Sequence, residues 1–363
     1  MKHSVANGGG VAAHYSATRG LTGVGSILMV YGCGAVGLRI ARAARTAGLD
    51  TSVGGRDPAK VAAAAAAVGV PWRSAPVDDP VLLEGLLRGV RVLVNVAGPM
   101  ARTAPALMEA CLRSGCHYLD VSNELAVFIE AWPRDRAARQ ADVAVVPGAG
   151  FATAVVESLA HRVLGRIPDA DSVTIVRSSP GGTRSEGVRR TSSALLAAGG
   201  WSVDAGQLMR TPDNVLTFRL PEGARAAVPI GSGEVFAVAR ATGVPNVAAY
   251  YTSRAAPWLS RLAVPLARHW ARAGFRLPSR ARSTPAGPDG SPKPLSRIWL
   301  RASNSHGAVA DGWVEAAGTE TTAAIAVESA LRLESGATVG VLTSGELLGP
   351  DFALGIPGLR LGE

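Results

Sequence analysis

The strongest structural signal in this chain is Ser26-Ile-Leu-Met-Val-Tyr-Gly-Cys-Gly-Ala-Val-Gly37. An apolar run ends in three glycines, at positions 32, 34 and 37, which have the spacing G-x-G-x-x-G. A helix-forming run, residues 38–47, follows directly. This order predicts a buried strand, a tight turn and a helix N-terminus, the arrangement that binds the pyrophosphate of a dinucleotide.

Each residue of the turn has an expected part in that site. Gly32 permits the turn, Gly34 lets the backbone approach the phosphates, and Gly37 lets the helix pack on the strand. Ala35 and Val36 lie at the helix N-terminus, where free N–H groups and the positive end of the helix dipole face the anion. We therefore predict that these five residues bind the cofactor.

The end of the second predicted strand, residues 50–55, indicates which cofactor is bound. NAD-binding chains carry an acidic residue near this point, which binds the ribose 2′-OH. This chain has Gly55 followed by Arg56, and a guanidinium in that place suits a 2′-phosphate. Lys60 lies one helical turn further and adds positive charge. We predict NADP (NADPH) held by Gly55, Arg56 and Lys60; the alternative is that Arg56 is only a surface turn residue.

The composition is that of a globular chain with room for two domains. Of 363 residues, 47% are hydrophobic and 18% are charged. Residues 1–24 lack clear periodicity, and we predict a flexible extension there. No secretory signal follows Met1, and no apolar run reaches the roughly 20 residues that span a bilayer, so a cytoplasmic protein is predicted.

The cysteines and the charge point to neither a metal nor a nucleic acid. Cys33, Cys111 and Cys116 have no familiar zinc spacing, so no metal site is predicted. The net charge of +9 suggests nucleic acid as a partner, but the basic residues are scattered and no nucleic-acid-binding motif accompanies them. We predict no nucleic-acid partner, and assign part of the charge to the binding of NADP.

Strands and helices alternate along residues 26–150, which predicts a doubly wound parallel sheet in an α/β fold. Asp57 and Pro58 are expected to begin the second helix as its cap and first residue. The expected strands are 27–31, 51–55, 90–96, 118–121 and 143–146. The expected helices lie near 36–47, 58–68, 80–87, 104–114 and 134–141.

The pattern changes after residue 151, where we predict a second α/β domain with a mainly antiparallel sheet. A helix over 152–164 leads into strand-like segments at 172–177, 215–220, 227–229, 235–241, 247–251, 297–302 and 308–316. A final helix is expected over 319–333, and residues 340–346 are expected to return to the first domain. The predicted division is a Rossmann domain over 25–150, a substrate and dimerisation domain over 151–318, and a C-terminal segment over 319–363.

Several motifs make the chain resemble saccharopine dehydrogenase-like oxidoreductases, in the branch that contains trans-acting enoyl reductases. The motifs are the glycine turn, Gly55-Arg-Asp57, Asn95-Val-Ala-Gly-Pro99, His117-Tyr-Leu-Asp120 with Glu124, Pro147-Gly-Ala-Gly-Phe151, Thr242-Gly-Val-Pro-Asn-Val247 and Gly340-Val-Leu-Thr343. The resemblance covers roughly residues 26–350. It implies a Rossmann domain, an inserted α/β domain and NAD(P)-linked redox chemistry on C=N, C=C or related bonds.

The chain departs from that family at two places on the substrate side of the sheet. Asn123 replaces the usual glycine before Glu124, and Val155-Val-Glu-Ser158 replaces the usual Pro-Ser-Asp. The family's substrate therefore does not transfer directly to this chain.

The cofactor supplies the hydride, so the protein must orient it and provide a proton. Ala97, Gly98 and Pro99 follow a central strand, and their small size lets the nicotinamide ribose approach; a plain strand-to-helix turn is the alternative. Tyr118 and Asp120 share one face of the next strand. We name them as candidate catalytic residues: Tyr118 to donate a proton, and Asp120 to orient a substrate amine or a cofactor hydroxyl. The alternative is a buried structural tyrosine beside a capping aspartate.

Residues 258–277 form a basic amphipathic pattern, interrupted by Pro265. Leucines and Trp270 fall on one helical face and arginines on the other. Such a helix suits a peripheral contact with an anionic membrane or a hydrophobic substrate entrance. The alternative is packing in the core or at a dimer contact.

We predict an NADPH-dependent reductase that transfers hydride to a C=C or C=O bond of a hydrophobic, polyketide- or lipid-like metabolite. The enoyl reductase branch supports this substrate class, and the Ala-, Gly- and Arg-rich composition suggests bacterial secondary metabolism. The alternatives are a saccharopine-type C=N reductase, a non-catalytic NADP-binding protein of a lipid surface, and a redox-neutral cyclase or isomerase that retains its cofactor. A homodimer is expected.

Overall fold

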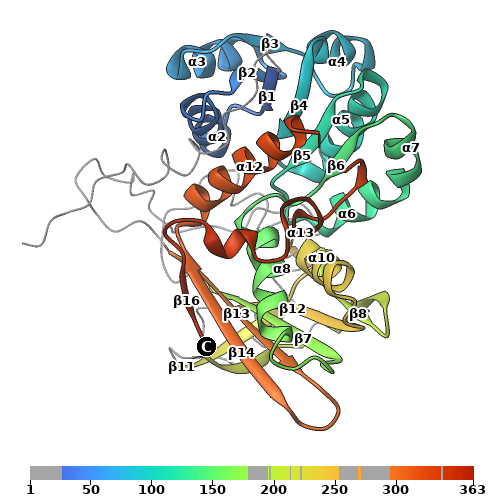
Figure 1. Cartoon of the computed structure of the whole chain (residues 1–363), viewed down its shortest axis with the longest axis vertical. Helices are drawn as coiled ribbons and strands as arrows, with labels where there is room; N and C mark the ends of the chain where they lie inside the picture. Colours follow the sequence, from blue (N-terminus) through green and yellow to red (C-terminus); the bar gives the residue numbers. More distant parts are fainter. Residues whose placement is uncertain are drawn as a thin grey trace, which may run out of the picture.

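The computed structural model describes residues 27–178, 195, 198–212, 214–220, 223–252, 269–270, 295–336 and 338–363. The predicted extension over 1–24 and nearly all of the amphipathic pattern over 258–277 lie outside these residues. The described residues form two sheets, with helices α8, α10 and α12 between them (Figure 1).

The first sheet has seven strands in the order β15-β6-β5-β4-β1-β2-β3, and all its pairings are parallel. The predicted doubly wound parallel sheet is confirmed. The strands are β1 (Ile27–Tyr31), β2 (Asp50–Gly55), β3 (Trp72–Ser74), β4 (Val90–Asn95), β5 (His117–Asp120), β6 (Ala144–Val146) and β15 (Gly340–Val341). The helices that connect them are α2 (Ala35–Thr46), α3 (Pro58–Val68), α4 (Pro80–Leu87), α5 (Met100–Ser114), α6 (Leu125–Ala131), the 3-10 turn η2 (Trp132–Arg134) and α7 (Asp135–Gln140).

Local chemistry sets where these helices begin. The side chain of Asp57 accepts a hydrogen bond from the backbone N–H of Lys60 at 3.2 Å, and Pro58 is the first helical residue of α3. Asp79 caps α4 in the same way, through the N–H of Leu82 at 3.0 Å. Such caps satisfy N–H groups that the first helical turn leaves without partners.

The second sheet has nine strands, with the order β10-β11-β12-β7-β13-β14-β16 and a side ribbon in which β8 pairs with β12 and β9. The β12–β7 pairing is parallel and the others are antiparallel, so the predicted mainly antiparallel sheet is confirmed. The strands are β7 (Ser172–Ser178), β8 (Gly200–Asp204), β9 (Gln207–Thr211), β10 (Leu216–Leu220), β11 (Gly223–Pro229), β12 (Asn246–Thr252), β13 (Ser296–Ser303), β14 (Val309–Ala316) and β16 (Arg360–Gly362).

The prediction of a strand over residues 235–241 was wrong, because this segment lies within helix α10 (Gly233–Thr242). Its apolar residues, among them Val235 and Val238, are buried. A short apolar run does not by its periodicity distinguish a buried helix from a strand. Gly243, at φ +74°, ends the helix in the left-handed conformation that favours glycine.

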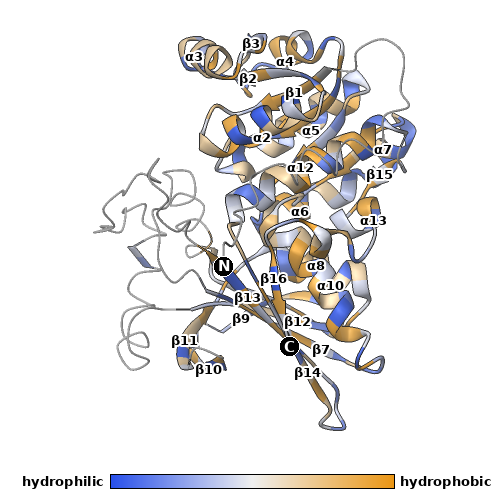
Figure 2. Cartoon of the chain, turned by 60° about the vertical axis from the view of Figure 1, so that its left-hand side comes forward, coloured by the Kyte–Doolittle hydropathy of each residue, from blue (hydrophilic) through white to orange (hydrophobic). Residues whose placement is uncertain are grey.

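Helix α8 (Phe151–Leu164) links the two sheets. Ten of its fourteen residues are buried, and Figure 2 shows hydrophobic residues along most of its length. A single hydrophobic core joins Val30 of the first sheet, Leu159 of α8 and Ile298 of the second sheet. The two sheets therefore share one core.

The C-terminal segment returns to the first sheet. Helix α12 (Gly318–Glu334) packs against α2 and α8, and β15 then pairs with β6, with Gly340 opposite Ala144. The last elements are α13 (Ser344–Leu348) and the 3-10 turn η3 (Phe352–Gly355). The expected return of residues 340–346 to the first sheet is confirmed, although only two of them form a strand.

Candidate functional site

The glycine turn after β1 has the tight packing that its spacing predicts. Gly32 has φ +129°, and a Cβ there would lie 2.9 Å from the backbone nitrogen of Ala97. A Cβ on Gly37 would lie 2.0 Å from the carbonyl oxygen of Gly32. These two glycines therefore allow β1, α2 and the end of β4 to approach one another.

Gly34 differs from its two neighbours, because a Cβ added there would meet no atom within 4 Å. It is the N-cap of α2, it provides no side-chain cap, and the first helical turn contains no acidic residue. Open space thus lies beside the uncapped N-terminus of a twelve-residue helix. This arrangement of Gly34, Ala35 and Val36 fits the pyrophosphate of a dinucleotide.

The end of β2 has no room for the acidic side chain that an NAD-binding chain carries. A Cβ on Gly54 would lie 2.9 Å from the sulfur of Met29, and one on Gly55 would lie 3.0 Å from the Val61 side chain. Two glycines therefore stand at this end of the strand for reasons of packing.

The positive charges beside that strand end lie at the surface. Arg56 is exposed and makes no hydrogen bond or ion pair within the described part of the chain. Burial raises the pKa of the Tyr31 hydroxyl to about 12, and the charge of Arg56 partly opposes the rise, which places Arg56 near that ring. Lys60 is exposed, and its Nζ lies 3.4 Å from Asp57. The guanidinium is thus available to a phosphate group.

A buried hydrogen-bond network holds the segment after β4. The Asn95 side chain accepts from the backbone N–H of Ala97 at 3.0 Å and donates to the Tyr118 hydroxyl at 3.0 Å and to Thr103 at 3.1 Å. The Thr103 hydroxyl donates to the Ala97 carbonyl at 2.8 Å. The turn formed by Ala97, Gly98 and Pro99 is therefore fixed by side chains on both sides.

Tyr118 and Asp120 belong to the same network and have no exposed surface. The Tyr118 hydroxyl donates to one carboxylate oxygen of Asp120 at 2.9 Å. The other oxygen accepts from the backbone N–H groups of Ser122 at 2.8 Å and Gly148 at 2.9 Å. This geometry matches the structural alternative for both residues, since it ties the ends of β4, β5 and β6 together.

Burial also shifts the pKa values of Tyr118 and Asp120. It raises the pKa of Asp120 to about 6, against the lowering effect of the Gly148 and Ser122 N–H groups. It raises the pKa of Tyr118 well above its ordinary value, and the neighbouring Asp120 adds to that rise. A phenol made less acidic in this way is a poorer proton donor.

Glu124 holds the start of helix α5. Its two carboxylate oxygens accept from the backbone N–H groups of Met100 and Ala101, each at 3.0 Å. It therefore caps α5 directly after the Ala97–Pro99 turn. The sequence gives no local signal for this contact, because Glu124 follows Met100 by 24 positions and Ala101 by 23 positions.

His117, the first residue of β5, does not belong to this network. His117 is buried, and its Nδ1 accepts from the Ala144 N–H at 3.0 Å, so its role is structural.

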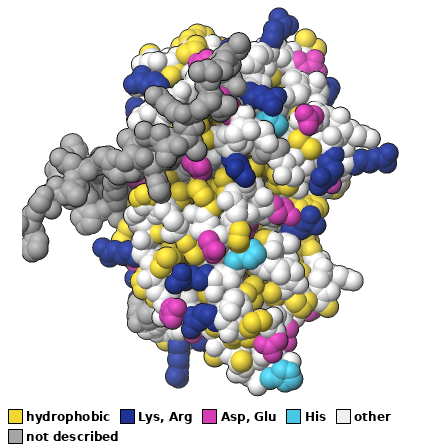
Figure 3. All heavy atoms as spheres, viewed as in Figure 1, with side chains coloured by type: hydrophobic (Ala, Val, Ile, Leu, Met, Phe, Trp, Pro, Cys, Tyr) yellow, Lys and Arg dark blue, Asp and Glu magenta, His cyan; other side chains and the backbone are white. Residues whose placement is uncertain are grey.

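Among the described residues, no group of three His, Cys, Asp or Glu side chains is placed to hold a metal ion. No described helix is both long and apolar enough to cross a membrane. On the face in Figure 3, basic and acidic side chains are interspersed.

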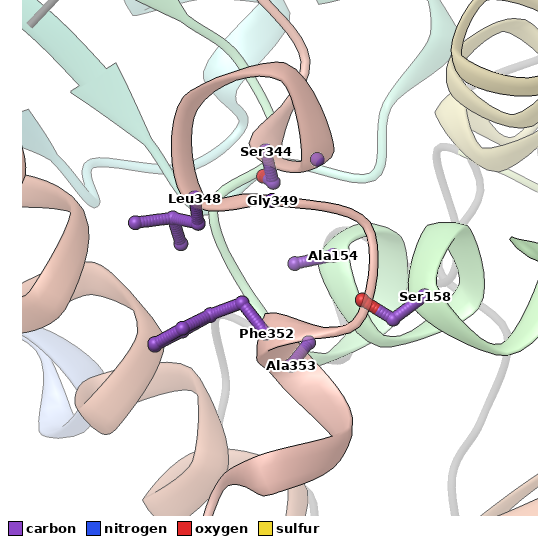
Figure 4. Close-up of a pocket in the computed structure, with 8 residues that line it drawn as sticks. Ala154, Ser158, Ser344, Leu348, Gly349, Phe352 and Ala353 are labelled. Atoms are coloured by element: carbon purple, nitrogen blue, oxygen red, sulfur yellow. The ribbon is translucent and has the colours of Figure 1, made fainter.

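A recess between α8 and the C-terminal segment contains none of the predicted site residues. Ala154 and Ser158 of α8 face Phe352 and Ala353 across it (Figure 4), with Ser344, Gly345, Leu348 and Gly349 completing the lining. It has no room for a water molecule. It therefore does not provide a substrate site.

Comparison with known families gives one match to this chain. Residues 28–146 match the model described as the saccharopine dehydrogenase NADP binding domain. This range contains the glycine turn, Arg56, the Ala97–Pro99 turn and the Tyr118–Asp120 pair. A comparison with curated proteins gives no match.

A solved structure extends the similarity in fold to most of the chain. The apo saccharopine dehydrogenase (L-Glu forming) of Saccharomyces cerevisiae is 14% identical, with a TM-score of 0.59, over 93% of this chain and 99% of that one. A probable dehydrogenase from Thermotoga maritima is 13% identical, with a TM-score of 0.46, over 90% and 93% of the two chains. The yeast structure shows that both domains share its fold.

Proposed function

We propose that the chain is a saccharopine dehydrogenase-like oxidoreductase whose first domain binds NADP, and that it transfers a hydride from NADPH to a C=C or C=O bond of a hydrophobic metabolite. The observation that carries the cofactor part of this proposal is the open space at Gly34, beside the uncapped N-terminus of α2, and the acceptor class rests on the resemblance to enoyl reductases. The NADP-binding family match and the exposed Arg56 support the choice of phosphate-bearing cofactor. When bound, the cofactor supplies the hydride.

We propose that Gly32, Gly34, Ala35, Val36 and Gly37 hold the pyrophosphate. Gly55, Arg56 and Lys60 would receive the 2′-phosphate, with the Arg56 guanidinium providing the main contact. Ala97, Gly98 and Pro99 would lie against the nicotinamide ribose, because they follow the central strand at the carboxyl edge of the parallel sheet.

We propose that Tyr118 and Asp120 position the edge of the sheet. For Tyr118 this replaces direct proton donation, and for Asp120 it replaces the orientation of a substrate amine or a cofactor hydroxyl. Their complete burial supports this change, as does the use of all their hydrogen bonds to hold the ends of three strands. Asp120→Asn should then leave NADPH affinity within about threefold and lower kcat, since misplacement of the edge affects the reaction geometry. The contrary result is a variant that matches the unaltered chain at higher pH and loses kcat only at low pH, where the unaltered chain has Asp120 protonated. That result would argue that Asp120 acts as a direct acid.

Consumption of NADPH with a panel of acceptors tests the reaction. We expect turnover with an α,β-unsaturated thioester or a hydrophobic ketone, and none without an acceptor. Turnover only with a mixture of an amine and a 2-oxo acid would favour the C=N alternative. Product formation without net NADPH loss would favour the redox-neutral alternative, and NADPH binding without any turnover would favour the non-catalytic one.

The domain division proposed for this enzyme is 25–150, 151–318 and 319–363. The pairing of β15 with β6 supports it, because the C-terminal segment completes the sheet of the first domain. The homodimer, the cytoplasmic location, the bacterial secondary metabolism and the lipid-surface contact of 258–277 stay predictions from the sequence.

A further inference from the structure

One ion pair lies where the second sheet meets the carboxyl edge of the first. Arg177, near the end of β7, places its Nη1 2.9 Å from an oxygen of Glu234, in the first turn of α10. The side chain of Glu234 is 0% exposed and that of Arg177 is 15% exposed. The pair therefore brings two charges out of water, which costs free energy unless each is paired and hydrogen-bonded.

The hydrogen bonding of this pair is incomplete. Neither carboxylate oxygen of Glu234 has a hydrogen-bond partner that meets strict geometric limits, although the Ser232 side chain lies close enough to lower the pKa of Glu234 as a hydrogen-bond partner. The ion pair with Glu234 is the one polar contact of Arg177 within the described part of the chain. A guanidinium carries five N–H donors in a planar fork, and the described residues engage this one only through Glu234. The guanidinium is partly exposed, so its remaining N–H donors are open to a further partner.

Two backbone contacts connect the pair to the proposed nicotinamide position. Ser232, just before α10, forms an isolated antiparallel β-bridge with Glu124 through the backbone. The N–H of Gly233 donates to the Asn123 carbonyl at 2.8 Å. Glu124 in turn caps α5 at Met100, next to the Ala97–Pro99 turn. The ion pair is therefore joined through two short links to the segment where the reacting carbon is expected.

We propose that Arg177 binds an anionic oxygen group of the substrate, a carboxylate or a phosphate ester, and that Glu234 holds the guanidinium at this junction. An oxyanion matches the fork of a guanidinium, and Arg is the residue best suited to such groups where water is largely excluded. Burial raises the pKa of Glu234 and the charge of Arg177 lowers it, which agrees with a pair whose charges depend on each other. The substrate class becomes an amphipathic acid, with an apolar body and one anionic end.

Binding of simple probes to the full chain saturated with NADP+ tests this site without turnover. The probes are octanoate, octyl phosphate and the neutral octanamide, followed by calorimetry and by the shift in Tm. We expect one of the two anions to bind at least about tenfold more tightly than octanamide. The anion that does so distinguishes a carboxylate from a phosphate ester.

Three variants assign the effect to the ion pair. Arg177→Gln should abolish the preference for the anion, and Arg177→Lys should weaken it while keeping the ion pair with Glu234. Glu234→Gln should tighten anion binding, because Arg177 loses its competing carboxylate. Arg301→Gln is the matched control, since Arg301 lies on the adjacent strand and pairs with Asp311 at 2.7 Å on the other face of the sheet. It should leave all three probes unchanged.

Two results would overturn the proposal: equal binding of the three probes to the unaltered chain, or an anion preference that survives in Arg177→Gln. If Arg177→Gln does not fold, Arg177→Lys and Glu234→Gln decide between the outcomes. The identification of the ligand as substrate rests on the proposed reductase function. NADPH binding is measured separately, so failure of the anion site and failure of the proposed function give different results.

Discussion

The two sides of the proposed site are built by different means. The cofactor side, at the ends of β1 and β2, consists of backbone, glycines and one exposed arginine, all within residues 32–60. The side toward the second sheet consists of buried charged side chains from distant segments, such as Arg177 and Glu234. Shape therefore dominates the first side and electrostatics the second, and the two should respond differently to substitution and to pH.

Two glycines of the same turn provide the strongest test of the cofactor side. Gly37→Ala should destabilise the fold by roughly 3–5 kcal/mol, because the new Cβ would lie 2.0 Å from the Gly32 carbonyl oxygen. Gly34→Ala should leave Tm nearly unchanged, since its Cβ meets no atom within 4 Å. It should nevertheless weaken NADPH binding at least about tenfold by occupying the pyrophosphate space. Denaturant unfolding and NADPH titration measure the two effects.

Comparison of Gly37→Ala with Gly34→Ala distinguishes a glycine needed for packing from a glycine needed for cofactor binding. If Gly34→Ala bound NADPH as well as the unaltered chain, the pyrophosphate would lie elsewhere. If both variants lost stability equally, the open space at Gly34 would not distinguish it from Gly37.

Glu157, a buried carboxylate outside the proposed site, tests the effect of buried charge through the pH dependence of stability. Burial raises its pKa from the ordinary 4.5 to about 7, and the nearby Glu346 adds to the rise. Its Oε2 accepts from the backbone N–H of Gly345, so it joins α8 to α13. Because the folded-state pKa is the higher one, the folded chain holds the proton more tightly, and stability is lost as pH rises from about 4.5 to about 7. The expected loss is about 3 kcal/mol.

Glu157→Gln is the matched variant, because it keeps an acceptor for the Gly345 N–H and removes the titration. Urea unfolding across this pH range should give a smaller loss of stability than in the unaltered chain. Asp120, whose pKa is also raised, to about 6, contributes equally to both proteins and cancels in the difference. Identical pH profiles would mean that Glu157 is not the group that titrates.

The same contrast explains what the sequence predicts and what it does not. The strand, turn and helix at the start of the chain are set by adjacent residues, so β1 was predicted with its observed bounds, Ile27–Tyr31. The cap by Glu124 on Met100 and the pairing of Arg177 with Glu234 depend on tertiary contacts between separated segments. Only the fold brings those groups together. The segment of α10 was predicted as a strand because a helix that is buried on most sides lacks the one-sided apolar pattern that identifies a helix from sequence.

Arg56→Ala tests the choice of cofactor. It should weaken NADPH binding by about 10- to 100-fold, since a charge-assisted contact with the 2′-phosphate is lost. NADH binding should change little, because NADH lacks that phosphate. Fluorescence titration with both nucleotides measures the ratio. An equal loss for the two nucleotides would move the role of Arg56 from the 2′-phosphate to the pyrophosphate or to the fold.

Lys60→Ala gives the smallest expected effect and defines how the 2′-phosphate is held. Lys60 is exposed and already lies 3.4 Å from Asp57, so its charge is partly neutralised and screened by salt. NADPH binding should weaken only about two- to threefold at low ionic strength, and the difference should vanish in high salt. The loss caused by Arg56→Ala should persist in high salt, because a direct bidentate contact is less screened. If instead Lys60→Ala cost as much as Arg56→Ala, the phosphate would lie over the start of α3, and the cofactor side too would depend on surface charge.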